Sequence, residues 1–118
     1  MRLFGILFSL ALFGCTALPL TAGPAGENAA KAVVIDVRSQ KEWSEGHLEG
    51  AVLLPLEQVE AGIEKVVPDR KQQIQLYCRT GRRSGIAQES LKKLGYENVS
   101  NEGSLKEASE KLRRPIVK

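Results

Sequence analysis

Short apolar runs alternate with amphipathic stretches from residue 33 to residue 114. The β-branched run from Val33 to Ile35, the segment from Ala51 to Leu54 and the segment from Ile74 to Tyr77 each have the length and composition of a buried strand. A fourth, shorter strand is predicted at residues 98–100. The pattern therefore predicts four short strands.

Apolar residues at helical spacing lie between and after these strands. Helices are expected from Ser39 to Gly46, from Leu56 to Val66, from the residues after Cys78 to Leu94, and from Ser104 to Leu112. The first and the last begin with a capping box, a serine followed three residues later by a glutamate. These pairs are Ser39 with Glu42 and Ser104 with Glu107.

The alternation of strands and helices predicts an α/β fold, with a small parallel sheet flanked by helices on both faces. Residues 33–114 hold enough apolar positions for a single domain, and no internal repeat is present. In parallel sheets of this kind the ligand site lies at the carboxyl ends of the strands. Cys78 follows the third strand directly, so it is expected at such an end.

The N-terminal segment has the pattern of a secretory leader. Arg2 precedes an almost unbroken apolar run from Leu3 to Phe13, which is too short for a confident membrane span. Two processing sites are compatible with it: residues 1–22 form a signal peptide cut after Ala22, or a lipoprotein leader ends before Cys15. Residues 23–32 are then a linker, and the protein is expected to be exported to the periplasm. Any membrane attachment would be a lipid anchor on Cys15.

Composition and charge narrow the classes of partner. The 118-residue chain has a formal net charge of +3, and Arg2 is the only charged residue of the leader. This charge is too small to indicate nucleic-acid binding, and the basic residues cluster locally at positions 79–83. One histidine and one domain thiol give no zinc-site spacing, so no metal is expected. We expect a monomer.

Cys78 is the candidate nucleophile. It has no disulfide partner once Cys15 is removed or acylated, and a lone thiol in an oxidising compartment indicates chemistry, although a buried inert cysteine is the alternative. A strand that turns into a helix through a tight loop directs backbone N–H groups at one point, and the helix dipole favours an anion there. A thiolate at that point would have a lowered pKa.

The arginines around the thiol favour an anion site. Arg79, Arg82 and Arg83 oppose the helix dipole unless an anion lies among them, the alternative being a solvated basic loop. Gly81 is expected to allow the loop to turn its amides inward through a positive φ angle. Four residues separate Cys78 from Arg83, and residue 84 is a serine. The Cys-x5-Arg spacing of cysteine phosphatases is therefore absent, which disfavours phosphate-ester or arsenate chemistry.

The segment from Cys78 to Ser84 resembles the active-site loop of rhodanese-type sulfurtransferases. A second motif agrees in order and spacing with the N-terminal signature of that domain, at Asp36, Arg38, Glu42, Trp43, Gly46, His47, Leu48, Gly50, Ala51, Leu54 and Pro55. A weaker C-terminal match comprises Gly95, Tyr96, Val99 and Gly103, with Ser104 where many relatives carry a second glycine. The resemblance covers nearly all of residues 33–112 and is strongest to exported single-domain members.

This resemblance implies a rhodanese-like fold and a two-step sulfur transfer. Cys78 would take the outer sulfur of thiosulfate, a small anionic donor, and pass it from a covalent persulfide to cyanide or another thiophilic acceptor, such as a thiol. No organic cofactor is then needed. The loop that would bind donor and persulfide comprises Arg79, Thr80, Gly81, Arg82, Arg83 and Ser84, with Asp36 and Arg38 as pocket support. His47 is expected to be structural and to hydrogen-bond the turn from Gly46 to Gly50.

One alternative function stays open. The chain would then be a persulfide carrier or binding module for a protein partner, with little turnover of thiosulfate.

Overall fold

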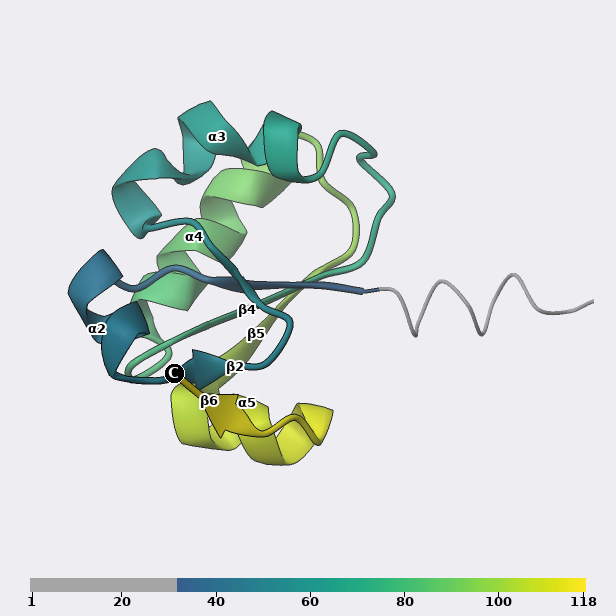
Figure 1. Ribbon diagram of the computed structural model, residues 1–118. Helices are drawn as coiled ribbons and strands as arrows, with labels where there is room; N and C mark the ends of the chain where they lie inside the picture. Colours follow the sequence, from purple (N-terminus) through teal and green to yellow (C-terminus); the bar gives the residue numbers. More distant parts are fainter. Residues whose placement is uncertain (1–31) are drawn as a thin grey trace, which may run out of the picture.

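The computed structural model describes residues 32–118 (Figure 1). The predicted leader, Cys15 and nearly all of the predicted linker lie outside the described residues. Within residues 32–118, none of the helices has the length and apolar character needed to cross a membrane.

The sheet contains the four predicted strands, all parallel. They are β1 (Val33–Asp36), β3 (Val52–Leu53), β4 (Ile74–Cys78) and β5 (Val99–Ser104), in the order β3-β1-β4-β5. The central strands pair from Val33 with Ile74 to Asp36 with Tyr77. β5 is longer than predicted and leads directly into the last helix, so the end of β5 lies beside the end of β4, with Ser104 opposite Cys78. The predicted parallel sheet is confirmed.

Helices cover both faces of this sheet, as predicted (Figure 1). α3 (Val59–Val66), preceded by a short 3-10 turn at Leu56–Gln58, and α4 (Arg82–Lys93) pack on one face, and α5 (Leu105–Leu112) packs on the other. The larger core lies under α3 and α4. It includes Ile35 and Leu76, while Val34 and Tyr77 belong to the smaller core under α5. Because strand side chains alternate, Cys78 lies on the same side as Leu76.

The helix α2 (Gln40–Glu45) follows β1 and has the predicted caps. The Ser39 hydroxyl accepts the Glu42 N–H, and the Glu42 carboxylate accepts the Ser39 N–H. Gly46 closes the helix by donating its N–H to the Trp43 carbonyl at 3.1 Å. This helix lies beside the carboxyl end of the sheet in Figure 1, close to the loop after β4.

The structure also contains a small antiparallel ribbon that the sequence did not predict. β2 (His47–Leu48) pairs with β6 (Ile116–Val117), so the ordered structure continues beyond the predicted domain end at residue 114. Two-residue strands have no measurable alternation, and their pairing joins segments almost 70 residues apart along the chain. Local pattern alone therefore does not reveal the ribbon.

His47 is structural, but its partner differs from the expected one. Its ring stacks on the ring of Trp43, with centroids 3.5 Å apart and an interplanar angle of 4°. Its Nδ1 atom lies 3.0 Å from the Trp43 carbonyl oxygen. Since that oxygen can only accept, Nδ1 carries the proton. His47 thus bonds the end of α2 and not the turn between Gly46 and Gly50.

Candidate active site at the carboxyl end of strand β4

The loop between β4 and α4 bends sharply around the Cys78 side chain. Cys78 is the last residue of β4, and Gly81 is the N-cap residue of α4. Gly81 has φ of +96°, and a Cβ there would lie 3.3 Å from the Gly103 Cα atom in the adjoining strand. The prediction of a positive φ angle at Gly81 is confirmed, and the close approach of two backbones adds a second reason for glycine.

The loop provides hydrogen-bond donors to the Cys78 sulfur. The Gly81 N–H donates to Sγ at 2.9 Å, and the Ser84 hydroxyl lies 3.5 Å from Sγ. Burial by itself raises the pKa of the Cys78 thiol, but hydrogen bonds from the Ser84 hydroxyl and from the amides of Ser84, Thr80 and Gly81 outweigh it, so the pKa is lowered. The site therefore favours a thiolate, mainly through hydrogen bonds of the loop.

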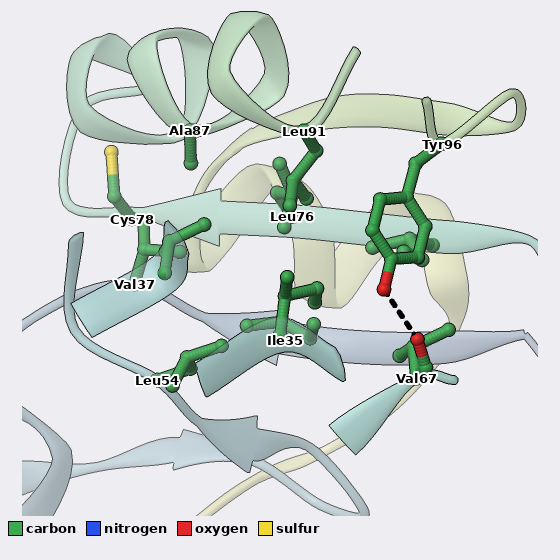
Figure 2. Close-up of a cluster of buried hydrophobic side chains, with 12 residues drawn as sticks. Ile35, Val37, Leu54, Val67, Leu76, Cys78, Ala87, Leu91 and Tyr96 are labelled. Atoms are coloured by element: carbon green, nitrogen blue, oxygen red, sulfur yellow. Dashed lines mark hydrogen bonds between the residues drawn. The ribbon is translucent and has the colours of Figure 1, made fainter. Parts of the chain in front are cut away.

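The thiol itself is closed off from solvent. Cys78 and Ser84 are both 0% exposed, whereas Arg79 and Thr80 are exposed. In Figure 2 the sulfur points toward the start of α4, in the same cluster as Val37 and Ala87. From the sequence we expected a reactive thiol at a ligand site, with a buried cysteine as the alternative, and in the structure the thiol is buried. The reason is the alternation of the strand, which turns the last side chain of β4 into the core under α4.

Asn101, a residue that the sequence analysis did not single out, holds the loop against β5. Its Oδ1 atom accepts the Ser84 hydroxyl at 2.7 Å and the Gly103 N–H at 2.9 Å, and its Nδ2 atom donates to the Gly81 carbonyl at 3.0 Å. The two backbone partners determine which way the amide points, because one can only donate and the other can only accept. Asn101 lies one residue beyond the strand predicted at residues 98–100, so no signal in the sequence marked it.

The Ser84 hydroxyl has one proton and three acceptors within reach. They are Asn101 Oδ1 at 2.7 Å, the Gly81 carbonyl oxygen at 3.2 Å and Cys78 Sγ at 3.5 Å. A single O–H group donates to one of these at a time, and the shortest contact is to Asn101. The Gly81 amide, which has no competing acceptor, is therefore the constant donor to the sulfur.

The three arginines differ in their surroundings. Arg83 makes a bidentate pair with Glu42, with both N–O distances at 2.9 Å, and Arg79 lies 3.9 Å from the same carboxylate. Arg82 is exposed and forms no ion pair with any residue of the described part of the chain. From the sequence we expected an anion among these arginines. In the structure an anion does lie beside two of them, and it is the protein's own carboxylate.

The Glu42 carboxylate is held firmly in its ionised form. The hydrogen bond from Arg83 lowers the pKa of Glu42 most, burial opposes it, and the bonds from Ser39 add to it, so that the pKa is about 2. The Glu42 side chain is 17% exposed. Glu42 thus serves α2 as a capping residue and the loop as the counter-ion of Arg83.

Asp36 and Arg38 form a buried ion pair at the end of β1, with the Arg38 guanidinium 2.7 Å from the Asp36 carboxylate. Arg38 also donates to the Gly46 carbonyl at 2.6 Å and lies over the Tyr77 ring. These contacts tie β1 to the end of α2. Asp36 and Arg38 therefore support the site indirectly, by fixing the helix that bears Glu42.

Comparisons with known proteins agree with this geometry. The family model "Rhodanese-like domain" matches residues 24–111. The chain is 41% identical to thiosulfate sulfurtransferase PspE of Escherichia coli over 73 residues, 62% of this chain and 70% of PspE. YrkF of Bacillus subtilis, whose name describes a sulfur carrier protein, is 34% identical over 68 residues, 58% of this chain and 36% of YrkF. A solved structure, rhodanese with anions from E. coli, has a TM-score of 0.68 and 38% identity, covering 74% of this chain and 98% of that one.

Proposed function

Because this chain belongs to the rhodanese-like domain family of sulfurtransferases, we propose that it transfers sulfane sulfur from thiosulfate through a persulfide on Cys78. The observation that carries the proposal is the donation of the Gly81 N–H to Cys78 Sγ at 2.9 Å, at the start of a helix with no side-chain cap. A thiolate in this position is stabilised at neutral pH and is a competent nucleophile. The similarity to PspE supports thiosulfate as the donor.

The first step is the attack of the Cys78 thiolate on the outer sulfur of thiosulfate. A bond forms between Sγ and that sulfur, the S–S bond of thiosulfate breaks, and its electron pair leaves on sulfite. The products are a cysteine persulfide anion and the sulfite dianion, so the total charge is unchanged. In the second step cyanide or another thiophilic acceptor attacks the terminal sulfur. With cyanide, thiocyanate leaves and the thiolate is restored.

The loop residues have separate roles in this proposal. The amides that now face Sγ would stabilise the anionic terminal sulfur as an oxyanion hole stabilises oxygen. Arg79 and Arg82 are exposed and would attract the anionic donor. Arg83, which is paired with Glu42, would interact with the charge of Cys78 from the start of α4. The sulfur is carried covalently, so the proposed reaction uses no metal and no organic cofactor.

The buried thiol adds one requirement. A donor contacts Sγ only after part of the surrounding loop moves, because Cys78 has no exposed surface. Arg79 and Thr80 are the exposed residues of this loop and are not part of a helix or strand. We therefore expect opening at these two residues to precede sulfur uptake.

We also propose that the leader directs export to the periplasm. The support is the sequence pattern alone, with a signal peptide of residues 1–22 and a lipid-anchored form on Cys15 as the two possible products. The mass of the mature N-terminus from the native host distinguishes them, and an intact Met1 in the mature protein would contradict export.

Sulfur uptake is the direct test of the function. Purified protein incubated with thiosulfate should gain the mass of one sulfur atom, and cyanide should remove it with release of thiocyanate. Cys78→Ser is the matched control and should gain nothing, because its hydroxyl is not ionised at neutral pH. Failure of the parent protein to gain sulfur, in a sample whose thiol is shown to be reduced, would overturn the proposal.

The carrier function is the second candidate, and the similarity to YrkF supports it. It predicts that Cys78 accepts sulfur readily from a persulfide-bearing donor protein while thiosulfate turnover is negligible. Measuring both rates on the same preparation separates the two functions. Uptake from thiosulfate at a comparable or higher rate would favour the enzyme.

A further inference from the structure

A negatively charged side chain, that of Glu42, lies beside the loop and has no part in the proposed sulfur-transfer steps. Glu42 comes from α2, 41 residues before Arg83, yet its two oxygens meet both terminal nitrogens of that guanidinium. The same carboxylate is 3.9 Å from Arg79. It therefore occupies the donor edge of Arg83 that a thiosulfate oxygen would otherwise bind.

We propose that Glu42 determines how strongly the site prefers a dianionic sulfur donor, by balancing the charge of Arg83. With Glu42 ionised, Arg83 is part of a neutral pair, and attraction of the donor depends on Arg79 and Arg82. The site then presents less positive charge than its three arginines would by themselves. Glu42 acts through Arg83 and is a positioning residue. This inference rests on the proposed thiosulfate activity.

Capping alone does not explain the geometry of Glu42. Glu107 has the same place in the capping box of α5, where its carboxylate accepts the Ser104 N–H at 2.9 Å. Glu107 forms no ion pair within the described residues, so a glutamate can cap a helix of this protein without an arginine. Glu42 differs from Glu107 because it also makes a bidentate ion pair with Arg83, and this pair places its negative charge beside the Cys78 loop.

The charge of Glu42 also affects the ionisation of the Cys78 thiol, through Arg83. The hydrogen bond that Arg83 donates to Glu42 raises the pKa of Arg83 most, burial opposes it, and the negative charge of Cys78 raises it further. The coupling between Arg83 and the thiolate is mutual, so any change in the charge around Arg83 alters the ionisation of Cys78. Neutralising Glu42 should leave Arg83 with an unbalanced charge and lower the pKa of the thiol.

Glu42→Gln tests the proposal while retaining the cap. Glutamine is also found at the third position of capping boxes, and its carbonyl oxygen can accept the Ser39 N–H. The half-saturating thiosulfate concentration for single-turnover sulfur uptake should fall about fivefold, on the scale of one ion pair near the surface. The limiting rate should change little. An organic thiosulfonate, which carries one negative charge instead of two, should show a smaller decrease, and added salt should weaken the thiosulfate effect.

Glu107→Gln is the matched control. It makes the same chemical change at the same helix position, where the glutamate forms no ion pair with an arginine of the described residues, and should leave the thiosulfate dependence and the thiol pKa as in the parent protein. Thermal unfolding of both variants shows how much of any effect is loss of helix capping.

The outcomes separate this inference from the proposed function. A rise or no change in half-saturating thiosulfate for Glu42→Gln would overturn it, because Glu42 would then only hold Arg83 in place. If the parent protein takes no sulfur from thiosulfate, the proposed function fails, and the thiol pKa decides the role of Glu42. That pKa is measured from the ultraviolet absorbance of the thiolate. A lower value in Glu42→Gln supports charge balancing, and an equal or higher value contradicts it.

Discussion

Helices α4 and α5 begin side by side at the carboxyl ends of neighbouring strands, but their first turns are built in opposite ways. The Ser104 hydroxyl caps α5 by accepting the Glu107 N–H, and Glu107 places a negative charge in the first turn. Helix α4 begins at Gly81 with no side-chain cap and has no acidic residue in its first turn. Its first two residues, Arg82 and Arg83, are positive.

The difference shows how this fold makes a place for an anion. In α5 the side chains of the helix occupy its first amides and complement the dipole, which stabilises the helix. In α4 the Gly81 amide points at Cys78 Sγ. Because α4 has no side-chain cap and begins with two arginines, its first turn is less stable than that of α5. Its backbone N–H groups and its positive charge are then available to the sulfur. The comparison can be tested by altering each helix start separately.

Gly81→Ala should have the largest effect, because it changes the backbone that directs the amide at sulfur. A side chain at φ of +96° costs about 1–2 kcal/mol of stability. The added Cβ would also press on Gly103, at 3.3 Å from its Cα atom. Sulfur uptake should slow by about a hundredfold, the lower end of the effect of losing one oxyanion-hole donor, and the thiol pKa should rise. Single-turnover uptake and thiolate absorbance measure the two effects.

Gly95→Ala is the control for backbone strain. Gly95 has φ of +97°, and a Cβ there would meet only the Arg70 side chain at 3.7 Å, which is an ordinary contact. This variant should lose similar stability and keep the parent rate of uptake. Equal uptake by Gly81→Ala and Gly95→Ala would show that the Gly81 amide does not assist the sulfur.

Arg82→Ala should have a smaller effect on uptake and the opposite effect on stability. Removing a positive charge from the first turn of α4 should raise the free energy of unfolding by about 0.3–1 kcal/mol. The half-saturating thiosulfate concentration should rise about twofold to fivefold, on the scale of one exposed charge pair. Chemical denaturation and single-turnover uptake provide the two measurements.

Arg83→Ala gives the contrast with Arg82. It leaves the Glu42 carboxylate without its bidentate partner, so it should lower stability by about 1 kcal/mol as well as weaken thiosulfate use. If both arginine variants shift stability in the same direction, the distinction between a free and a paired arginine at this helix start is wrong.

Ser104→Ala should have the smallest effect on the reaction. It removes the cap of α5 and should cost about 1 kcal/mol of stability, while sulfur uptake stays at the parent rate. Thermal unfolding and the uptake assay check both parts. A large loss of uptake at unchanged stability would show that the start of α5 takes part in the chemistry, and the contrast between the two helices would be lost.

Apart from the ribbon of β2 and β6, the amino-acid sequence by itself determined the helices and strands, and it placed Cys78 at the carboxyl end of a strand. The strand before Cys78, the two capping boxes and the need for glycine at residue 81 depend on neighbours along the chain, and the structure has them as predicted. Such features are encoded locally, because the period of apolar residues and the capping of a helix involve only a few consecutive positions. The rhodanese-like fold follows from these elements in this order.

Only the tertiary structure decided which groups meet at the loop. Glu42 joins Arg83 across 41 residues, Asn101 joins Ser84 across 17, and β6 joins β2 from the far end of the chain. The direction of the Cys78 side chain, into the core under α4, also depended on how the helix lies over the sheet. Contacts of this kind depend on distances in space that no local pattern records. For this reason the sequence indicated where a sulfur anion would be held, but not that a carboxylate of the protein would share its arginines.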